Sequence, residues 1–333
     1  MNKIDIRYLA KELNLAISTV SRALRDSHEI SPETKEKVFA LAKRLNYQPN
    51  PNASGLRGQK SKIIAVVIPD MVNDFFSLVI SGIEKITQAQ GYHFLLYFTH
   101  GDHALEVSFI NTLANGRVDG VLLSITDENN NNEHLEELNR KGIPLVLFDR
   151  VSERLDNVKV TSDNYESAVT ATRHLIDTGC KKIAYLKVHK SIPVGTIRES
   201  GYLEALEKYS KQPAPLILEC TNDNDEAFAA IRNMLEKEKP DGIFASLEKL
   251  AVVCYRVCEQ VQLKIPEDIK VISFSNLQTA ALLNPSLTTI TQPAFEIGET
   301  AARELLRIIR KKGGAKGDVV LKSRLIERRS TSK

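Results

Sequence analysis

The chain has 333 residues, of which 42% are hydrophobic and 26% are charged, so it has enough apolar material to form packed cores. Its longest clean apolar run, Ile63–Ile68, is far shorter than the ~18–20 residues that a transmembrane helix needs. The polar N-terminal segment lacks the apolar core of a signal peptide, which argues against export and predicts a cytoplasmic protein. The four cysteines match no zinc-binding spacing, and we expect reduced thiols.

The charge is divided unevenly along the chain. Residues 1–62 contain 12 Lys and Arg against 6 Asp and Glu, whereas the remaining 271 residues contain 33 against 36. A basic head on a slightly acidic body indicates that the head alone contacts a polyanion, either a nucleic acid or a membrane surface.

Three short amphipathic helices are predicted in the head. The first covers residues 4–13, with Asp5 as its N-cap, and the second covers residues 17–24. Asn14, between them, tolerates the left-handed backbone that a tight turn requires. Ser31-Pro32-Glu33 supplies the cap, the first-turn proline and the acid of a third helix that ends near Leu45.

Two helices, a short turn and a supporting helix are typical of a helix-turn-helix unit, whose second helix enters the major groove of DNA. A three-helix domain that binds another protein is the alternative. An amphipathic membrane helix is disfavoured, because each of these helices is short and buries its apolar stripe against its neighbours.

Buried strands alternate with helices from Ile63 onward. The strands are predicted to begin near residues 63, 93, 120 and 144, and again near 183, 216, 242 and 271. The near-constant offset between the two sets, and the echo between Val118–Leu122 and Pro240–Phe244, indicate a repeated unit. We therefore predict an all-α head followed by an α/β body of two tandem Rossmann-like parallel-sheet subdomains.

Two such sheets facing each other form a cleft for a small molecule at the carboxyl ends of their strands, and the cleft closes by hinge motion. No phosphate-binding loop, nucleophile motif or metal-binding motif occurs, so we predict neither an enzyme nor a cofactor. His100, Asp102 and His103 are interpreted as solvated loop residues rather than metal ligands. Cys254 and Cys258, one helical turn apart, are interpreted as helix interior.

Three motifs follow one another in the head, namely Thr19-Val20-Ser21-Arg22, Ile30-Ser31-Pro32-Glu33-Thr34 and Leu45-Asn46-Tyr47-Gln48-Pro49-Asn50. In their residues, order and spacing they resemble the LacI/GalR family of bacterial transcription regulators. Further family-like motifs follow in order through the body as far as Leu325–Thr331, so the resemblance covers nearly the whole chain.

The resemblance implies a DNA-binding surface. Ile17, Ser18 and Arg22 occupy base-reading positions of the recognition helix, and Arg22 would donate two hydrogen bonds to a guanine. Other positions match phosphate contacts or a hinge helix that enters the minor groove; these are Thr19, Ser21 and Asn50 for phosphates, Ala53 for close approach of paired hinge helices, and Leu56 for the minor-groove wedge. Ala16 stands where the family usually has Ser, so the recognition helix lacks its usual N-cap hydroxyl.

The resemblance also implies a domain plan. The helix-turn-helix spans 1–48 and the hinge 49–61; the first subdomain comprises 62–161 with 293–327, and the second comprises 162–292. Pro293–Lys312 and the final strand would thus return to the first subdomain. Because Pro51 and Gly55 disfavour a helix, we expect the hinge to be disordered without DNA; a passive tether is the alternative.

The same resemblance places an effector site in the cleft. Asp149 and Arg198 match effector-contacting positions, and the expected set is Asn73, Phe75, Asp149, Arg198, Leu247 and Ser275. Leu247 and Ser275 depart from the Asn and Asp that commonly bind a sugar in this family. A modified or phosphorylated sugar is favoured by Arg198 together with the nearby Lys187, His189 and Lys190.

These expectations combine into a sequence-specific regulator, a repressor rather than an activator, that binds a palindromic operator as a homodimer under control of a sugar or sugar derivative. Its partners would be operator DNA, the effector and a second copy of itself, with no membrane contact. A solute-binding protein of a transport system and an α/β enzyme are the alternatives from other classes.

Overall fold

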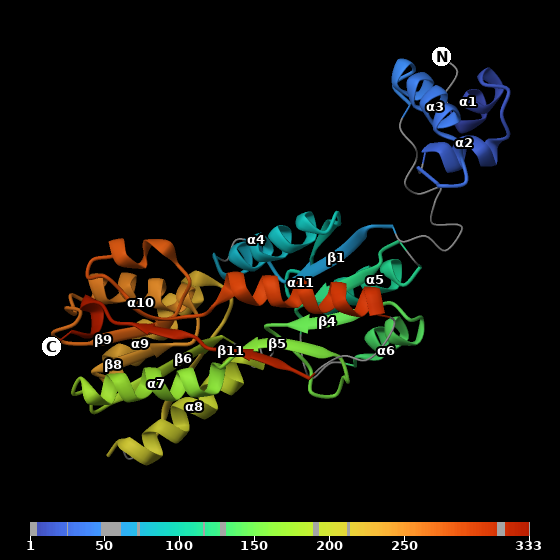
Figure 1. Ribbon diagram of the computed structural model, residues 1–333. Coiled ribbons are helices and arrows are strands. Elements are labelled where there is room, and N and C mark those ends of the chain that lie inside the picture. Colours follow the sequence, from blue (N-terminus) through green and yellow to red (C-terminus); the bar gives the residue numbers. More distant parts are fainter. Residues whose placement is uncertain are drawn as a thin grey trace. The chain divides into compact units, whose positions relative to one another are not determined.

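The computed structural model describes residues 5–24, 26–47, 61–71, 74–115, 117–126, 131–188, 193–211, 214–311 and 317–332. The chain divides into two compact units, a head (residues 1–61) and a body (residues 62–333), each of which is coloured along the sequence in Figure 1. None of the helices in these described stretches is long and apolar enough to cross a membrane.

The head contains α1 (Ile6–Glu12), α2 (Ile17–Leu24) and α3 (Pro32–Arg44). The Asp5 side chain accepts a hydrogen bond from the backbone of Tyr8 at the start of α1, and Ser31 caps α3 in the same way. Asn14 has φ of 50°, the left-handed conformation predicted for the turn. Apolar side chains from all three helices meet in one core, including the fully buried Leu9, Val20 and Val38. The three predicted helices are confirmed.

The body consists of two lobes. The first lobe is built on a sheet with the strand order β11-β5-β4-β3-β1-β2. Its elements are β1 (Ile63–Ile68), α4 (Asp74–Ala89), β2 (His93–Phe98), α5 (His103–Leu113), β3 (Gly120–Leu123), α6 (Glu133–Arg140), β4 (Leu145–Phe148), β5 (Val158–Ser162), α11 (Ala294–Lys311) and β11 (Val319–Leu321). Figure 1 shows α11 lying alongside α4.

The second lobe repeats this plan in a sheet with the order β12-β10-β9-β8-β6-β7. Its elements are α7 (Asn164–Asp177), β6 (Ile183–Val188), α8 (Pro193–Tyr209), β7 (Leu216–Cys220), α9 (Asn224–Glu238), β8 (Gly242–Ala245), α10 (Glu248–Gln260), β9 (Lys270–Phe274), a 3-10 helix (Gln278–Leu282), β10 (Thr288–Thr291), β12 (Arg324–Ile326) and a second 3-10 helix (Arg329–Thr331). Each predicted strand begins within one residue of the expected position, which confirms the duplicated parallel sheet.

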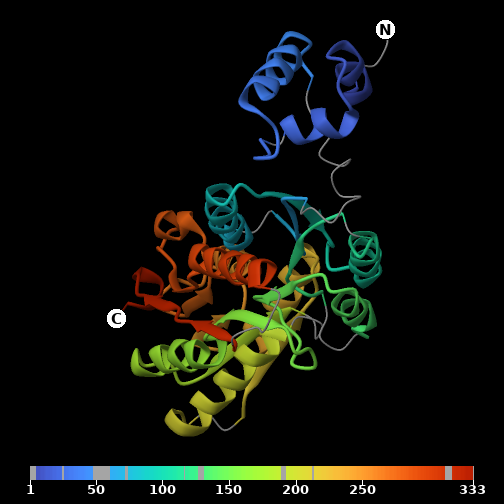
Figure 2. The ribbon, with the colours of Figure 1, turned by 45° about the vertical axis from the view of Figure 1, so that its right-hand side comes forward.

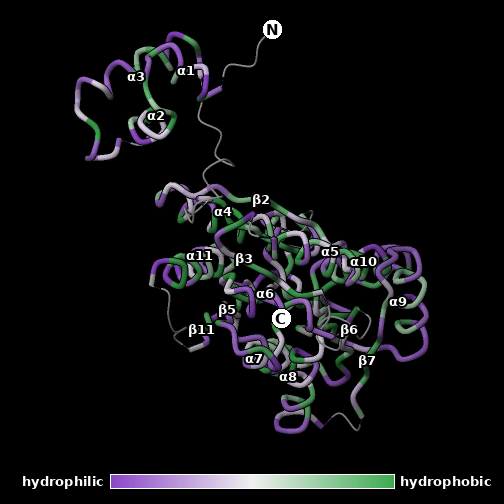
Figure 3. The backbone as a smooth tube through the Cα atoms, turned by 90° about the vertical axis from the view of Figure 1, so that its right-hand side faces the viewer, coloured by the Kyte–Doolittle hydropathy of each residue, from purple (hydrophilic) through white to green (hydrophobic). Residues whose placement is uncertain are grey.

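Each sheet is covered by helices on both faces, which explains why inner strands such as β1, β3 and β4 are apolar along their whole length. In β1, Ile64, Val66 and Ile68 pack against α4 and α11, whereas Ala65 and Val67 point to the opposite face, toward α5 and α6. Figure 3, coloured by residue hydropathy, shows hydrophobic segments inside the body and outer helices in which hydrophilic and hydrophobic residues alternate. All four cysteines are buried and free, and Cys254 and Cys258 lie in the α10 core as interpreted.

The chain crosses between the lobes after β5, after β10 and after β11. The expectation for the final strand was wrong in one respect. Residues 319–321 do return to the first sheet, parallel to β5, but Arg324–Ile326 pairs antiparallel with β10 of the second sheet. Residues 324–332 therefore belong to the second lobe. Figure 2 shows this red C-terminal segment passing along the edge of the body.

Candidate DNA-binding face and effector cleft

The outer face of α2 carries the residues predicted to contact DNA. Ile17, Ser18 and Arg22 are exposed, whereas Thr19 and Ser21 are half-buried beside the core residues Val20 and Ala23. A helix of this composition presents a hydroxyl group, a methyl-rich side chain and a guanidinium to solvent. These are groups that can contact base edges. The remaining predicted contacts, Asn50, Ala53 and Leu56, lie outside the described residues, as does the expected hinge helix.

Arg22 already has an ionic partner. Its guanidinium lies 2.9 Å from the carboxylate of Glu29, and both side chains are more than half exposed. An exposed pair of this kind is worth only ~0.2–1 kcal/mol, so Arg22 can exchange it for a base or a phosphate at little cost. The start of α2 shows the effect of Ala16, whose backbone carbonyl accepts from Thr19 and Val20 while its methyl group offers no cap.

A small cavity lies between the two lobes at the carboxyl ends of their strands. It has a volume of approximately 40 Å³. Its lining comes from the start of α4, the ends of β4, β8, β9 and β10, and helix α8, namely Phe75, Phe76, Asp149, Arg150, Val194, Arg198, Leu247, Glu248, Phe274, Ser275, Asn276 and Gln292. The structure thus brings together every predicted effector residue that it describes, while Asn73 lies outside the described residues.

Arg198 is the most constrained charge of this cleft. It is 2% exposed, and its guanidinium donates to Asn164 Oδ1 at 2.8 Å, to the carbonyl of Ser246 at 2.6 Å and to Gln292 Oε1 at 3.0 Å. Its guanidinium carbon also lies 3.6 Å from the ring centroid of Phe274, within cation–π range. Burial lowers the pKa of Arg198 to about 10, which leaves it cationic at neutral pH.

Asp149 faces Arg198 from the first lobe. Its backbone is left-handed, with φ of 58°, and its amide donates to the carbonyl of Val160 on β5. Burial raises the pKa of the Asp149 carboxyl, while Arg150 and Arg198 oppose that rise. The nearest Arg150 nitrogen is 3.9 Å from the carboxylate and has no hydrogen-bond partner among the described residues. One carboxylate and one cation are therefore available to a ligand in the closed cleft.

A carboxylate lies beside Ser275, one of the two positions that depart from the family. The Ser275 hydroxyl donates to Glu248 Oε2 at 2.9 Å, so an acid from the start of α10 stands beside the position where the family commonly has Asp. Burial raises the pKa of Glu248, although its hydrogen bond from Ser275 works in the opposite direction. Leu247 packs against the core of the second lobe. The carboxyl function expected to be missing is thus supplied by the neighbouring strand end.

The structure corrects the expected role of Lys187. Its ammonium group bonds to Glu199 and lies 3.1 Å from Glu219, away from the cavity lining. These two acids raise the pKa of Lys187 although burial lowers it. Lys187 therefore offers no free charge to a phosphate. His189 and Lys190 lie outside the described residues.

The cleft is closed in this structure. The amide of Gln278 in the second lobe donates to Asp74 Oδ2 in the first lobe at 3.3 Å. A volume of approximately 40 Å³ is far below the ~300–1,000 Å³ of typical ligand pockets, so a ligand the size of a sugar enters only when the lobes separate.

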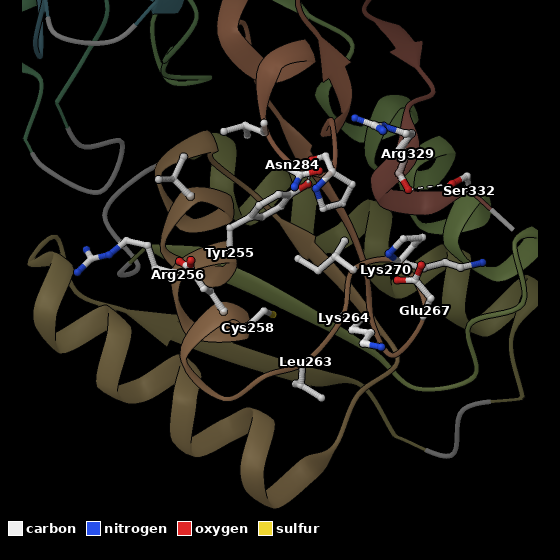
Figure 4. A pocket seen from close by; sticks show the side chains of 16 residues that line it. Tyr255, Arg256, Cys258, Leu263, Lys264, Glu267, Lys270, Asn284, Arg329 and Ser332 are labelled. Carbon is white, nitrogen blue, oxygen red and sulfur yellow. Dashed lines mark hydrogen bonds between the residues drawn. The ribbon is translucent and has the colours of Figure 1, made fainter.

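A much larger groove of approximately 1060 Å³ lies on the second lobe. Figure 4 shows its lining, with Tyr255, Arg256 and Cys258 on α10, Lys264 and Glu267 on the segment that leads into β9, and Lys270 as the first residue of β9. Because this segment precedes the strand, the groove lies at the amino end of β9. Open α/β sheets bind their ligands at the opposite edge, which favours the smaller cavity as the effector site.

Two residues that hold Arg198 in place were not among the predicted contacts. Gln292 accepts from Arg198 and donates to Ser162 Oγ at 2.7 Å, and thereby joins the ends of the crossing strands β10 and β5. Asn164 follows β5 directly and orients the other side of Arg198. Both obey the rule that site residues follow strand ends, but β5 itself was not predicted because Lys159, Thr161 and Ser162 interrupt its apolar pattern.

Comparison with known proteins agrees with this architecture. Residues 61–328 match a family model described as periplasmic binding proteins and sugar binding domain of LacI family, and residues 6–50 match the model of bacterial regulatory proteins, lacI family. The ribose operon repressor of Halalkalibacterium halodurans is 32% identical over 92% of this chain and 91% of its own.

Solved structures give the same result. A LacI family transcriptional regulator from Enterococcus faecium, with bound ribose, is 28% identical, with a TM-score of 0.72 over 81% of this chain and 98% of its own. A lac repressor dimer bound to operator and the anti-inducer ONPF has a TM-score of 0.87 over 100% of both chains at 21% identity, which shows the shared fold.

A helix-turn-helix head joined to a two-lobed ligand-binding body is the plan of DNA-binding transcription regulators rather than of enzymes. The chain belongs to the LacI family of such regulators.

Proposed function

We propose that this protein is a repressor that binds a near-palindromic operator as a homodimer, with a small sugar in the cleft setting its affinity for DNA. The observation that carries the proposal is the joint presence of an exposed, hydroxyl-rich recognition helix and a closed two-lobed cleft lined by balanced charges. Such a regulator would act in the cytoplasm, where bacterial DNA is found.

The DNA contacts follow from the face of α2. Arg22 would leave Glu29 and donate to a guanine, Ile17 and Ser18 would meet neighbouring base edges, and Thr19 and Ser21 would contact phosphates. Asn50, Ala53 and Leu56 would extend the contact to phosphates and the minor groove through the hinge. Two heads in a symmetric dimer read two half-sites, so the operator would be near-palindromic.

The effector class follows from the charges of the cleft. The cleft is lined by two acidic residues, Asp149 and Glu248, and by two basic residues, Arg150 and Arg198. Lys187 is paired with Glu199 and Glu219 outside this lining. This arrangement suits an uncharged sugar, whose hydroxyl groups bond to carboxylates and guanidinium alike, better than a phosphorylated one. The ribose-bound relative and the ribose operon repressor support a sugar of this kind. A sugar that binds one state of the cleft more tightly shifts the equilibrium between the open and closed lobes toward that state. The size of the shift is set by the difference in affinity for the two states, and the hinge would pass the change to the heads.

Operator binding is tested by selecting duplexes from a random pool with the full-length protein and measuring their affinity by fluorescence anisotropy. We expect a near-palindromic sequence whose affinity falls steeply as the salt concentration rises, because bound phosphates release counterions. Leu56→Ala should weaken binding to this operator and leave binding to non-specific DNA unchanged. Lys37→Gln on α3 is the control. Failure to enrich any sequence would refute the proposed DNA-binding function.

Effector control is tested with a panel of pentoses, hexoses and their phosphates. The sugar that raises the melting temperature should also change the affinity for the selected operator, and Asp149→Asn should reduce both effects. A sugar phosphate that acts while every uncharged sugar fails would contradict the assigned ligand class but leave the DNA-binding proposal intact.

A further inference from the structure

Two histidines and a glutamate converge in the first lobe, outside the effector cleft. His103 and Glu106 lie one turn apart at the start of α5, and His134 lies in the first turn of α6. One potential ligand atom from each residue lies within 4.8 Å of the other two. Both helices follow the carboxyl ends of strands, β2 and β3 respectively, and none of the three residues lines the cavity between the lobes.

The contacts of Glu106 and His134 fix two of the three groups. His134 Nε2 lies 2.9 Å from Glu106 Oε1, and these residues are 6% and 1% exposed. The other oxygen of Glu106 accepts from both the amide and the hydroxyl of Thr126, each at 2.7 Å. The carboxylate is therefore held in a single orientation with one oxygen turned toward the imidazole.

His103 is the group that this hydrogen-bond network does not account for. Its Nδ1 is buried and has no hydrogen-bond partner among the described residues. Its ring meets that of His134 edge to face, with centroids 5.3 Å apart. A buried nitrogen without a partner normally costs ~1–3 kcal/mol, so a purely structural role explains the Glu106–His134 pair but not the position of His103.

The types of ligand atom in this cluster indicate which kind of partner could bind to His103. Two imidazoles and one carboxylate are typical ligands of Zn²⁺ and related transition metals, whereas Mg²⁺ and Ca²⁺ favour all-oxygen sites. Thr126 would be the outer-shell group that orients the ligating carboxylate. Ligands ~2.0–2.2 Å from a tetrahedral Zn²⁺ are ~3.3 Å apart, so a small rotation of the His103 side chain completes the site.

We propose that His103, Glu106 and His134 form a binding site for a divalent transition metal of the zinc class, with water in the fourth position. The metal would join the start of α5 to the start of α6. The site is independent of the sugar cleft and of the DNA-binding face. His103 thus takes part in a different cluster from the one considered in the sequence, where its neighbours His100 and Asp102 were weighed; Asp102 instead caps α5.

The test uses the full-length, untagged protein after treatment with a chelator. Co²⁺ is added as the spectroscopic probe, followed by Zn²⁺ in competition. We expect one equivalent of Co²⁺ to give the intense visible absorption of a four-coordinate site, and Zn²⁺ to abolish that absorption and raise the melting temperature. His103→Ala should weaken binding by about 100-fold or more. Loss of an outer-shell partner weakens metal binding by ~10–100-fold, and loss of a direct ligand should cost at least as much.

His100→Ala is the matched control, because His100 is an exposed histidine three residues away. His103→Gln serves as a second variant, and melting in the absence of metal shows whether each variant is folded. The proposal is overturned if the parent protein gives no such absorption, or if a folded His103 variant binds Co²⁺ as tightly as His100→Ala. Glu106→Gln, which keeps the shape of the carboxylate, should lose the metal as well.

Discussion

Two arginines illustrate how differently the head and the cleft use the same side chain. Arg22 is more than half exposed and forms an ion pair with Glu29, which is also more than half exposed. Arg198 is almost completely buried and donates to three acceptors while stacking on Phe274. The first guanidinium is accessible to solvent and can exchange its partner, whereas the second is fixed by buried contacts that shape the cleft.

This difference separates folding from recognition. A residue on the DNA-binding face can change with little effect on stability, because water replaces what it loses. A residue in the cleft contributes to both properties, because its acceptors stay buried when it is removed. Substitutions in the two regions should therefore give opposite patterns of stability and binding.

The largest effect is expected for Arg198→Ala. Loss of a buried cation leaves Asn164, Ser246 and Gln292 without their donor, and we expect a decrease of about 3–5 kcal/mol in the free energy of unfolding. Urea denaturation followed by circular dichroism measures this change. Arg232→Ala, in an exposed ion pair on α9, should stay within ~0.5 kcal/mol of the parent. Similar values for the two variants would remove the contrast between cleft and surface.

Arg22→Ala should show the reverse pattern. We expect a loss of about 1–3 kcal/mol in binding free energy for the selected operator, with relaxed preference at one base pair, because the variant would lose the bidentate contact to guanine that we propose for Arg22. The free energy of unfolding should change by less than ~1 kcal/mol, the upper value for an exposed ion pair. Anisotropy titrations with the operator and its single-base variants measure the first quantity, and an unchanged base preference would exclude Arg22 as a base reader.

Glu248→Gln should change the pH dependence of stability. Burial raises the pKa of Glu248 in the folded protein, so at pH values between the unfolded-state pKa and the native pKa the native state holds a proton that the unfolded chain has released. The contribution of Glu248 to stability therefore falls as the pH rises above ~4.5 through the native pKa. The variant should gain stability relative to the parent between pH 4 and pH 7, and Glu259→Gln on the exposed face of α10 should not. A constant difference across this range would contradict the inferred burial of the charge.

Lys187→Gln is expected to have the smallest effect on ligand binding. The ammonium group is committed to Glu199 and Glu219 and does not line the cavity, so the affinity for the sugar should not change measurably. Isothermal titration calorimetry with the parent and the variant measures this. Marked weakening would show that Lys187 moves into the cleft when the lobes separate.

The periodic parts of the molecule could be predicted from the sequence. Asp5, Asn14 and Ser31 mark the ends of the head helices through local backbone chemistry, and the continuous apolar runs mark the strands that are buried on both faces. Most of the described cleft residues also follow from one rule, since they come directly after strands.

What the sequence could not supply depends on contacts between distant residues. Strand β5 has only five residues and alternates Val with Lys and Thr, so it lacks the continuous apolar run that identified the other buried strands. Glu248 stands in for the acid absent at Ser275 only because β8 and β9 are neighbours in the sheet. Likewise, His134 reaches Glu106 across 28 positions of the chain, and no local spacing indicates that encounter.

The short segment 319–326 has a consequence for biosynthesis. Its first half is the edge strand of one sheet and its second half the edge strand of the other, with two residues between them. Neither sheet can acquire its full set of strands on the ribosome until this segment has emerged, so both lobes reach their final form together and late. A chimaera in which one lobe is replaced by that of a relative must therefore also take the half of this segment that belongs to the exchanged lobe.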